Sequence, residues 1–204
     1  MHCKNGLLSK TNRTVGYIRN HQNTFRRLSW FFLSFLGARF LSEFYKSFIN
    51  NNNSIGFVAQ RMDKELLGII VGPLNPNGFF KKLLKRRWWA FCIASIEAVL
   101  KKPSCIPKLI RALFYRGDSP AGQTRALLSS IAVKKNVQGK GIGKTLIKRW
   151  LEEVNKRGAC GCYLTTDSIE NEGVNSFYQR LGWRIDSTYS TPDGRKINRY
   201  IFDF

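Results

Sequence analysis

One short run of the sequence combines glycine, lysine and threonine in a pattern suited to binding phosphate groups. The run covers residues 138–145 and reads Gln-Gly-Lys-Gly-Ile-Gly-Lys-Thr. Its glycines allow the backbone to turn tightly and to bring several N–H groups close to an anion. A helix that begins here would add the positive end of its dipole, and Lys140 and Lys144 supply positive charge. The run therefore predicts a site for a phosphate or pyrophosphate.

Three phosphate-binding motifs are candidates for this run, and their spacing separates them. The P-loop of nucleoside triphosphatases requires a glycine five residues before the Gly-Lys-Thr, where this chain has Gln138. The dinucleotide fingerprint Gly-x-Gly-x-x-Gly does not fit Gly139, Gly141 and Gly143. The pattern Gln-x-x-Gly-x-Gly, from Gln138 to Gly143, remains. A glycine-rich turn without a ligand is the alternative.

Two further segments accompany the loop in a familiar order. Residues 128–133 read Leu-Ser-Ser-Ile-Ala-Val, and residues 171–183 read Asn-Glu-Gly-Val-Asn-Ser-Phe-Tyr-Gln-Arg-Leu-Gly-Trp. In this order and separation the three segments resemble the GCN5-related N-acetyltransferase (GNAT) superfamily, whose loop of this form holds the pyrophosphate of acetyl-CoA. The resemblance is close over residues 126–183 and absent over 79–117.

The resemblance implies an α/β fold and a mode of acetyl transfer. The fold would be a single domain over residues 1–204, with a mixed central sheet of about six or seven strands, a splayed parallel pair, flanking helices and a basic helical insertion at about 79–117. Acetyl-CoA, without a metal, would be the donor, and transfer to a primary amine would be direct, in a ternary complex. A backbone N–H of the splayed strand would polarise the thioester carbonyl. By resemblance, the residues that bind acetyl-CoA are Ile131, Ala132, Val133, Gln138, Gly139, Lys140, Gly141, Ile142, Gly143, Lys144, Asn171 and Tyr178.

Two side chains are candidates for catalysis. Tyr178 matches a tyrosine that is thought to protonate the departing thiolate in relatives, and a phenol with a pKa near 10 suits this task; core packing is its alternative role. Many relatives place a glutamate on the strand before Asn171, where this chain has Thr165, Thr166 and Asp167. Asp167 is therefore the candidate for receiving a proton through water, and helix capping is its alternative role.

Hydrophobic periodicity and turn residues predict the elements that carry these groups. Strands are expected at 14–19, 54–62, 66–71, 126–133 and 162–167, and two more close the chain around a turn at 191–194. Helices are expected at 24–49, 142–157 and 171–181, and the insertion is expected to form two or three helices. The short crossover from strand 126–133 through a helix to strand 162–167 implies a parallel pair.

The charge of the chain limits its partners. Its 204 residues include 34 Lys and Arg against 13 Asp and Glu, a net charge of +21, of which 15 lie in residues 1–30 and 79–117. A positive protein disfavours polyamines and aminoglycosides as acceptors and favours an acceptor that carries phosphates. An amino sugar on a nucleotide or lipid carrier fits this description. Residues 35–41 and 78–80 are also similar to acetyltransferases of bacterial surface-polysaccharide gene clusters.

Other functions remain open at this point. Peptide or protein N-terminal amines are an alternative acceptor, and a non-catalytic module that responds to acyl-CoA is an alternative to an enzyme. The aromatic and basic insertion is suited to peripheral contact with an anionic membrane, or to packing on the domain. Specific binding of nucleic acid is not expected, because no nucleic-acid-binding motif accompanies the charge. The sequence leaves the oligomeric state and the acyl-chain preference open.

The cysteines and the N-terminal segment indicate a cytoplasmic protein. The five cysteines lack the paired spacing of a zinc site, so reduced thiols are expected. They are Cys3, Cys92, Cys105, Cys160 and Cys162, and the two histidines are His2 and His21. Residues 1–16 contain no apolar run of signal-peptide length. We expect a cytoplasmic location, with a peripheral position at the inner face of the membrane as the variant that the insertion suggests.

Overall fold

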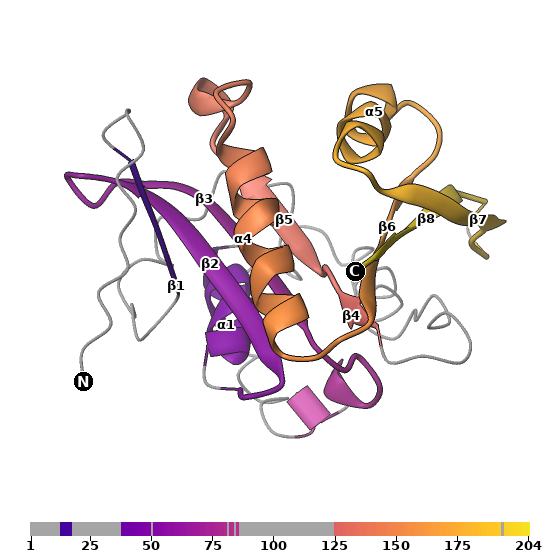
Figure 1. Cartoon of the computed structure of the whole chain (residues 1–204), viewed down its shortest axis with the longest axis horizontal. Coiled ribbons are helices and arrows are strands. Elements are labelled where there is room, and N and C mark those ends of the chain that lie inside the picture. The colour runs from indigo at the N-terminus through magenta and orange to yellow at the C-terminus, as the bar shows by residue number, and fades with distance from the viewer. Residues whose placement is uncertain are drawn as a thin grey trace.

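The computed structural model describes residues 13–17, 38–49, 51–80, 82–83, 85, 125–192 and 194–204. The strands in these residues are β1 (Arg13–Tyr17), β2 (Ser54–Arg61), β3 (Leu66–Pro73), β4 (Ala126–Leu127), β5 (Ser130–Val133), β6 (Gly161–Asp167), β7 (Arg184–Ser190) and β8 (Lys196–Asp203) (Figure 1). The helices are α1 (Ala38–Ile49), α4 (Ile142–Lys156), α5 (Glu172–Arg180) and the 3-10 helix η3 (Lys135–Val137).

The described strands form two four-stranded sheets. The first has the order β1-β2-β3-β5 and is antiparallel throughout. The second has the order β4-β6-β8-β7, and its only parallel pair in the described residues is β4 with β6. Every residue of β3 is buried, which explains its nearly continuous apolar sequence. The predicted α/β fold is present, but the single central sheet that we expected is divided in two.

The chain passes from one sheet to the other at Leu128 and Ser129. The N–H of Leu128 donates to the carbonyl of Tyr163 on β6 over 2.9 Å, and the next N–H, of Ser129, donates to Val71 on β3 over 3.0 Å. The register also places Ser130 opposite Val71, so two residues face one, as in a β-bulge. The strand expected over 126–133 is therefore two strands, because a bulge turns its second half toward β3.

This bulge separates two strands that begin side by side. Figure 1 shows β5 and β6 diverging from the short β4–β6 pair. We call this region, residues 127–133 and 163–167, the fork. It corresponds to the splayed parallel pair that the sequence predicted.

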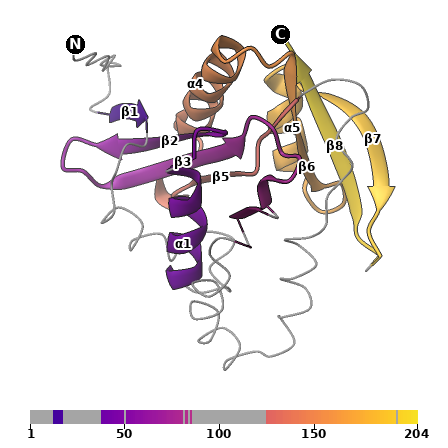
Figure 2. The same ribbon diagram turned by 90° about the horizontal axis from the view of Figure 1, so that it is seen from below.

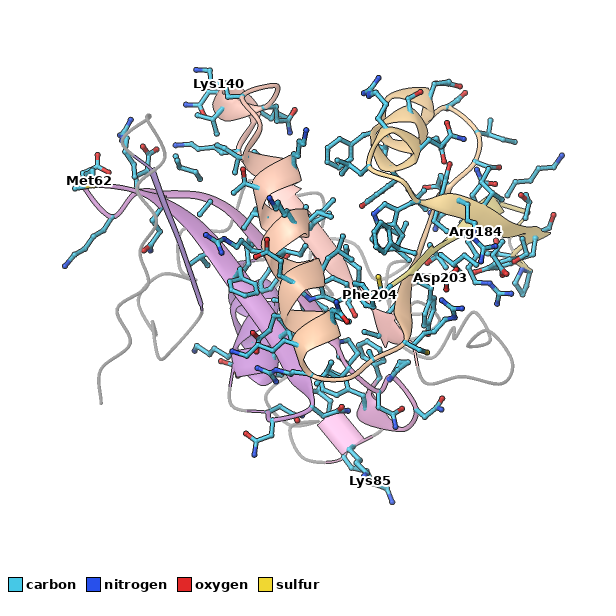
Figure 3. All side chains as sticks on the ribbon, viewed as in Figure 1. Met62, Lys85, Lys140, Arg184, Asp203 and Phe204 are labelled. Atoms are coloured by element: carbon cyan, nitrogen blue, oxygen red, sulfur yellow. The ribbon has the colours of Figure 1, made fainter. Side chains whose placement is uncertain are left out.

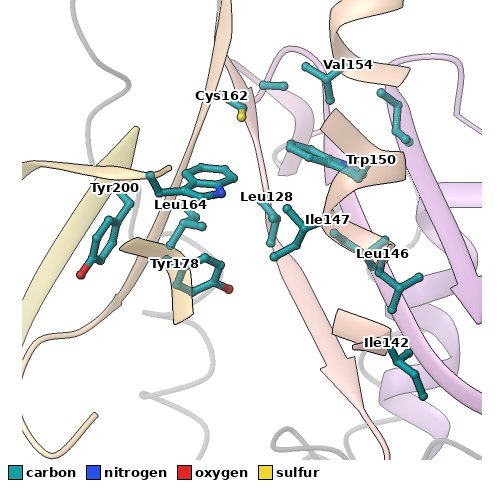
Figure 4. Close-up of a cluster of buried hydrophobic side chains, with 14 of the residues drawn as sticks. Leu128, Ile142, Leu146, Ile147, Trp150, Val154, Cys162, Leu164, Tyr178 and Tyr200 are labelled. Atoms are coloured by element: carbon teal, nitrogen blue, oxygen red, sulfur yellow. The ribbon is translucent and has the colours of Figure 1, made fainter. Parts of the chain in front are cut away.

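Helices cover the sheets and fill the space between them. Figure 2 shows α1 and α4 on opposite faces of the sheet that contains β2 and β3. The apolar stripe of α4 is buried, including Leu146 and Trp150, which are 0% exposed. These side chains share one core cluster with Leu128 in the fork, Cys162 on β6 and Tyr178 on α5 (Figure 4). Packing on one cluster therefore links both sheets to α4 and α5.

Other predictions on the elements have mixed outcomes. The helix expected over 24–49 is present from Ala38 to Ile49, and residues 24–37 lie outside the described residues. Most of the insertion at 79–117 also lies outside them, but its first residues are helical and pack inward: the Phe79 ring lies 5.2 Å from that of Phe48 on α1. Among the described residues, no helix is long and apolar enough to cross a membrane.

Candidate active site

The phosphate-binding loop predicted from the sequence connects η3 to α4. Gly139 and Gly141 have φ angles of 74° and 78°, in the left-handed region that glycine adopts without strain. Both glycines border open space, since a methyl group built on either would meet no atom within 4 Å. The loop can therefore turn sharply and still leave its backbone accessible to a ligand.

The first turn of α4 directs unused N–H groups into this loop. The N-cap is Gly141, no side chain caps the helix, and its first turn contains no acidic residue. The N–H of Thr145 is the first to bond within the helix, to the Gly141 carbonyl over 3.0 Å. The N–H groups of residues 142–144 precede it and have no partner within the helix. With the dipole of a 15-residue helix and the nearby lysines, they form a site suited to an anion.

The predicted loop residues differ in which of their side-chain and backbone groups are accessible to a ligand. Figure 3 shows Lys140 at the outer tip of the loop, and Lys144 is exposed in the first turn of α4. The side chain of Ile142 is buried in the core cluster, so only its backbone N–H faces the loop. Gln138 donates from Nε2 to the Val133 carbonyl over 3.0 Å, which ties the loop to the end of β5.

Alternate residues of β5 direct their backbone N–H and C=O groups toward the fork. Lys134 N–H donates to the Leu67 carbonyl, which marks a hydrogen-bonded pair of the antiparallel ladder with β3. Such pairs alternate, so the backbone groups of Ala132 face β3, and those of Ile131 and Val133 face the fork. β5 is an edge strand of its sheet within the described residues. The backbone groups of Ile131 and Val133 therefore face the fork, where the Val133 carbonyl accepts from Gln138, and those of Ala132 face β3.

The loop and α5 meet across the mouth of the fork. A methyl group built on Gly143 would lie 3.4 Å from Cζ of Phe177 and 3.7 Å from Cγ2 of Val133. The first turn of α4 therefore packs between β5 and α5, with contact distances that leave room only for glycine or alanine. Phe177 was not predicted as a site residue, although it belongs to the block at 171–183.

Tyr178 reaches from α5 into the core cluster beside the fork. Its side chain is 5% exposed and packs against Trp183 and Tyr200, with ring centroids 5.9 and 6.0 Å away. Figure 4 shows its hydroxyl directed toward the strand that carries Leu128. Among the described residues, no side chain forms a hydrogen bond with this hydroxyl. Burial raises the pKa of Tyr178, so the phenol keeps its proton at neutral pH.

Asn171 occupies the N-cap position of α5 but does not cap the helix with its side chain. Its Nδ2 instead donates to Oγ1 of Thr166 over 2.8 Å and to the Asp167 carbonyl over 3.0 Å, both at the end of β6. No donor within the described part of the chain bonds to its Oδ1. Asn171 is thus held in place by its amide nitrogen while its oxygen can accept a hydrogen bond from a ligand.

Asp167 lies at the end of β6 and is engaged by an arginine. Arg195, in the turn between β7 and β8, donates to both carboxylate oxygens at 2.8 Å from its Nη2, and its Nε donates to Oδ1 at 3.1 Å. The Asp167 side chain is 37% exposed. The structure therefore places this candidate base at the fork's edge with both oxygens already bonded.

Several side chains near the fork were not anticipated. The Tyr45 hydroxyl on α1 lies 3.0 Å from Oγ of Ser130, at the bulge. Asn175 on α5 bonds to β6 and β8.

The cysteines in the described part of the chain, Cys160 and Cys162, form no disulfide. No cluster of three or more metal-ligating side chains occurs in that part. The remaining cysteines and both histidines lie outside the described residues.

The sequence of the chain matches a known protein family and a known protein. The profile of the acetyltransferase (GNAT) family matches residues 21–183. N-alpha-acetyltransferase 30 from Schizosaccharomyces pombe is 34% identical over 77 residues, which cover 37% of this chain and 51% of that protein. The chain thus spans about half the length of the curated relative that it matches.

Solved structures share the fold at low sequence identity. An acetyltransferase of the GNAT family from Desulfovibrio desulfuricans has a TM-score of 0.61 at 14% identity, with 94% of this chain and 98% of that chain covered. NAA60 from Arabidopsis thaliana, in complex with acetyl-CoA, has a TM-score of 0.56 at 19% identity, with 94% and 98% covered. These similarities confirm the α/β fold class predicted from the sequence.

Proposed function

Because the chain belongs to the acetyltransferase (GNAT) family, we propose that it transfers the acetyl group of acetyl-CoA directly to a primary amine. The family match confirms the resemblance seen in the sequence and makes an acyltransferase the enzyme class. One observation carries the proposal. Around the fork lie the edge of β5 at Ile131, which no strand of the described residues covers, the uncapped start of α4 and the buried phenol of Tyr178.

The donor would lie along the fork with its pyrophosphate at the loop. The N–H groups of residues 142–144, with Lys140 and Lys144, are suited to the pyrophosphate charge. The pantetheine arm would pair with the open edge of β5, where Ile131 and Val133 offer backbone groups. Oδ1 of Asn171 would accept a hydrogen bond from the arm. The acetyl thioester supplies the activated acyl group.

Two groups of the chain would act on the reacting atoms. The N–H of Ile131 would donate to the thioester oxygen as charge develops on it when the amine attacks. Tyr178 would give its proton to the sulfur as the carbon–sulfur bond breaks, a role that its raised pKa permits because the phenol is neutral. The attacking amine would release a proton to water as the carbon–nitrogen bond forms. For Asp167, the three hydrogen bonds from Arg195 favour a positioning role over proton transfer.

The acceptor that we propose carries an amine and a negative charge, such as an amino sugar on a nucleotide or lipid carrier. Of the ten acidic side chains in the described residues, eight form ion pairs with lysine or arginine. Few carboxylates in that part are therefore available to bind a polyamine. The net charge of +21 acts in the same direction.

A second candidate acceptor is a peptide N-terminal amine. It is favoured by the 34% identity to a protein named as an N-alpha-acetyltransferase.

The test of both candidates is to incubate the full chain with acetyl-CoA and a panel of nucleotide-linked amino sugars, peptides and polyamines, and to measure free CoA and acceptor mass. Acetylation of amino sugars alone is expected, and acetylation of peptides alone would select the second candidate. Binding of acetyl-CoA without acetylation of any member would favour a non-catalytic binding module.

The arrangement of the whole chain is part of the proposal. We propose one acetyltransferase domain over residues 1–204, located in the cytoplasm, with a core at 126–183 and an insertion at 79–117 that contacts anionic membrane. The charge and aromatic content of the insertion support this contact. In a flotation assay with anionic vesicles, the full chain should float at low salt, and failure to float would remove the membrane from the proposal.

A further inference from the structure

Helix α5 is fixed to the sheet by few apolar contacts. It has nine residues, and Tyr178 is its only buried side chain. Val174, on the same helix, is 40% exposed. The other apolar side chains that pack on the core cluster here, Phe177 and Leu181, are partly buried and lie next to Tyr178, toward the end of the helix. The start of α5 therefore depends on polar contacts for its position.

The side-chain amide of Asn175 provides these contacts. Its Nδ2 donates to the Asp167 carbonyl on β6 over 3.0 Å and to the Asn171 carbonyl over 2.9 Å. Its Oδ1 accepts from the Tyr200 hydroxyl over 2.9 Å and from Nδ2 of Asn198 over 3.2 Å, both on β8. One amide thus makes four hydrogen bonds and ties α5 to two strands.

The partners of Asn175 are themselves held firmly. Tyr200 is 0% exposed and Asn198 is 8% exposed. Oδ1 of Asn198 accepts a hydrogen bond from Oγ1 of Thr188 on β7 over 2.8 Å. Because these groups are buried and paired, a change at Asn175 would leave Tyr200 and Asn198 without their partner.

Asn175 lies between the two residues of α5 that the proposed reaction needs. Asn171 is one turn earlier, and its Nδ2 donates to the same Asp167 carbonyl that Asn175 uses. Tyr178 is three residues later, on the neighbouring part of the same helix face. The contacts of Asn175 therefore fix the end of α5 that carries Asn171 and set the direction from which Tyr178 reaches the fork.

We infer that Asn175 is a positioning residue for the transfer reaction, through which α5 holds Asn171 against the donor and Tyr178 against the sulfur. The inference rests on the proposed function. A substitution of Asn175 should therefore have two effects. Loss of position at Asn171 would weaken acetyl-CoA binding, and loss of position at Tyr178 would slow turnover.

The first test replaces Asn175 by leucine, which has a similar size and makes no hydrogen bond, in the full chain. Titration calorimetry with acetyl-CoA alone should show an affinity about tenfold lower, and steady-state kinetics should show kcat reduced about ten- to hundredfold. Gln179→Ala is the matched control, because Gln179 is an exposed residue of the same helix. Unchanged affinity and kcat in a folded Asn175→Leu protein would overturn the inference.

A double-mutant comparison separates positioning from general loss of stability. If Asn175 acts through Tyr178, Asn175→Leu should reduce kcat by less than about twofold in a Tyr178→Phe background. An equal reduction in both backgrounds would overturn the inference. Tyr200→Phe removes only one hydrogen bond to Asn175, so it should lower acetyl-CoA affinity and kcat less than Asn175→Leu does. This variant tests the inference if the leucine variant does not fold. The acetyl-CoA titration needs no acceptor, so it remains decisive for Asn175 even where no acetyl transfer occurs.

Discussion

The starts of α4 and α5 face the same fork but are built in different ways. Both helices lack a side-chain cap. At α4 the proposed ligand site consists of backbone, with two glycines at positive φ and three N–H groups that have no partner within the helix. At α5 it consists of side chains, with Asn171 and Asn175 bonded to β6 and β8. The start of α4 is suited to binding a charged group, and the start of α5 holds individual side-chain atoms in fixed positions.

This difference predicts different responses to substitution. A site made of backbone N–H groups tolerates side-chain changes, so long as the backbone can keep its conformation. A site made of hydrogen-bonded side chains loses its geometry when one partner changes, because the others are left unsatisfied. Substitutions of the bonded side chains at α5 should therefore affect turnover, alone or together with donor affinity, and substitutions at α4 should affect mainly affinity for the donor.

The largest effect should follow from Tyr178→Phe on α5. The change removes the proposed proton donor and keeps the packed ring, so kcat should fall about 10²- to 10³-fold while the acetyl-CoA dissociation constant changes little. Steady-state kinetics and calorimetry measure the two quantities. Because burial raises the pKa of Tyr178, ionisation of this group should cause no loss of kcat as the pH rises to about 9.5. An unchanged kcat would remove Tyr178 from the mechanism.

The next effect should follow from Gly141→Ala at the start of α4. An alanine at φ 78° is strained by about 1–2 kcal/mol, and relief of that strain would move the N–H groups away from the donor. The acetyl-CoA dissociation constant should rise about tenfold, and kcat at saturation should change by less than about threefold.

Gly158 provides a matched control for this substitution. It lies just beyond the other end of α4, with a φ of 79°, and a methyl group built on it would meet no atom within 4 Å. Gly158→Ala should lower the unfolding temperature as much as Gly141→Ala does and leave acetyl-CoA affinity unchanged. Equal losses of affinity in the two variants would show that strain, and not the anion site, accounts for the effect.

These two starts also show what sequence can predict. The conformation of the loop at 138–145 was predictable because it depends on glycine spacing and on the helix that follows, both of which are local. The bonds of Asn175 were not, because they depend on which residues of β8 lie beside β6: Asn198 pairs with Thr166, and Tyr200 with Leu164. That register is set by contacts between segments far apart in the chain.

The division of strand 126–133 illustrates the same limit. Its residues are apolar or small throughout, so the pattern predicted one continuous strand. The interruption arises because the N–H of Leu128 meets Tyr163 and the N–H of Ser129 meets Val71. No local signal marks this change of partner. The fork itself was anticipated through the family resemblance, and the bulge that makes it is visible only in the structure.

A smaller effect should follow from Lys144→Ala in the first turn of α4. Lys144 is exposed, so its attraction to the donor's phosphates is weakened by solvent and salt. The acetyl-CoA dissociation constant should rise about threefold at low ionic strength, and the difference should nearly vanish at about 1 M salt. Lys148→Ala, one turn farther along α4, is the control and should change the constant less. Equal effects of the two substitutions would indicate a general charge effect in place of a local site.

The smallest effect should follow from Asp167→Asn beside the start of α5. Asparagine has the same size and keeps one oxygen for Arg195, and the ion pair that it replaces is partly exposed. The Asp167 backbone carbonyl, which Asn171 and Asn175 both use, is unaffected by the change. We therefore expect kcat to change by less than about twofold across pH 6–9. A fall of about 10²-fold would instead identify the carboxylate as the base and place a catalytic side chain on β6. In that case the contrast between the two helix starts would be incomplete, because a strand would supply part of the chemistry that we assign to α5.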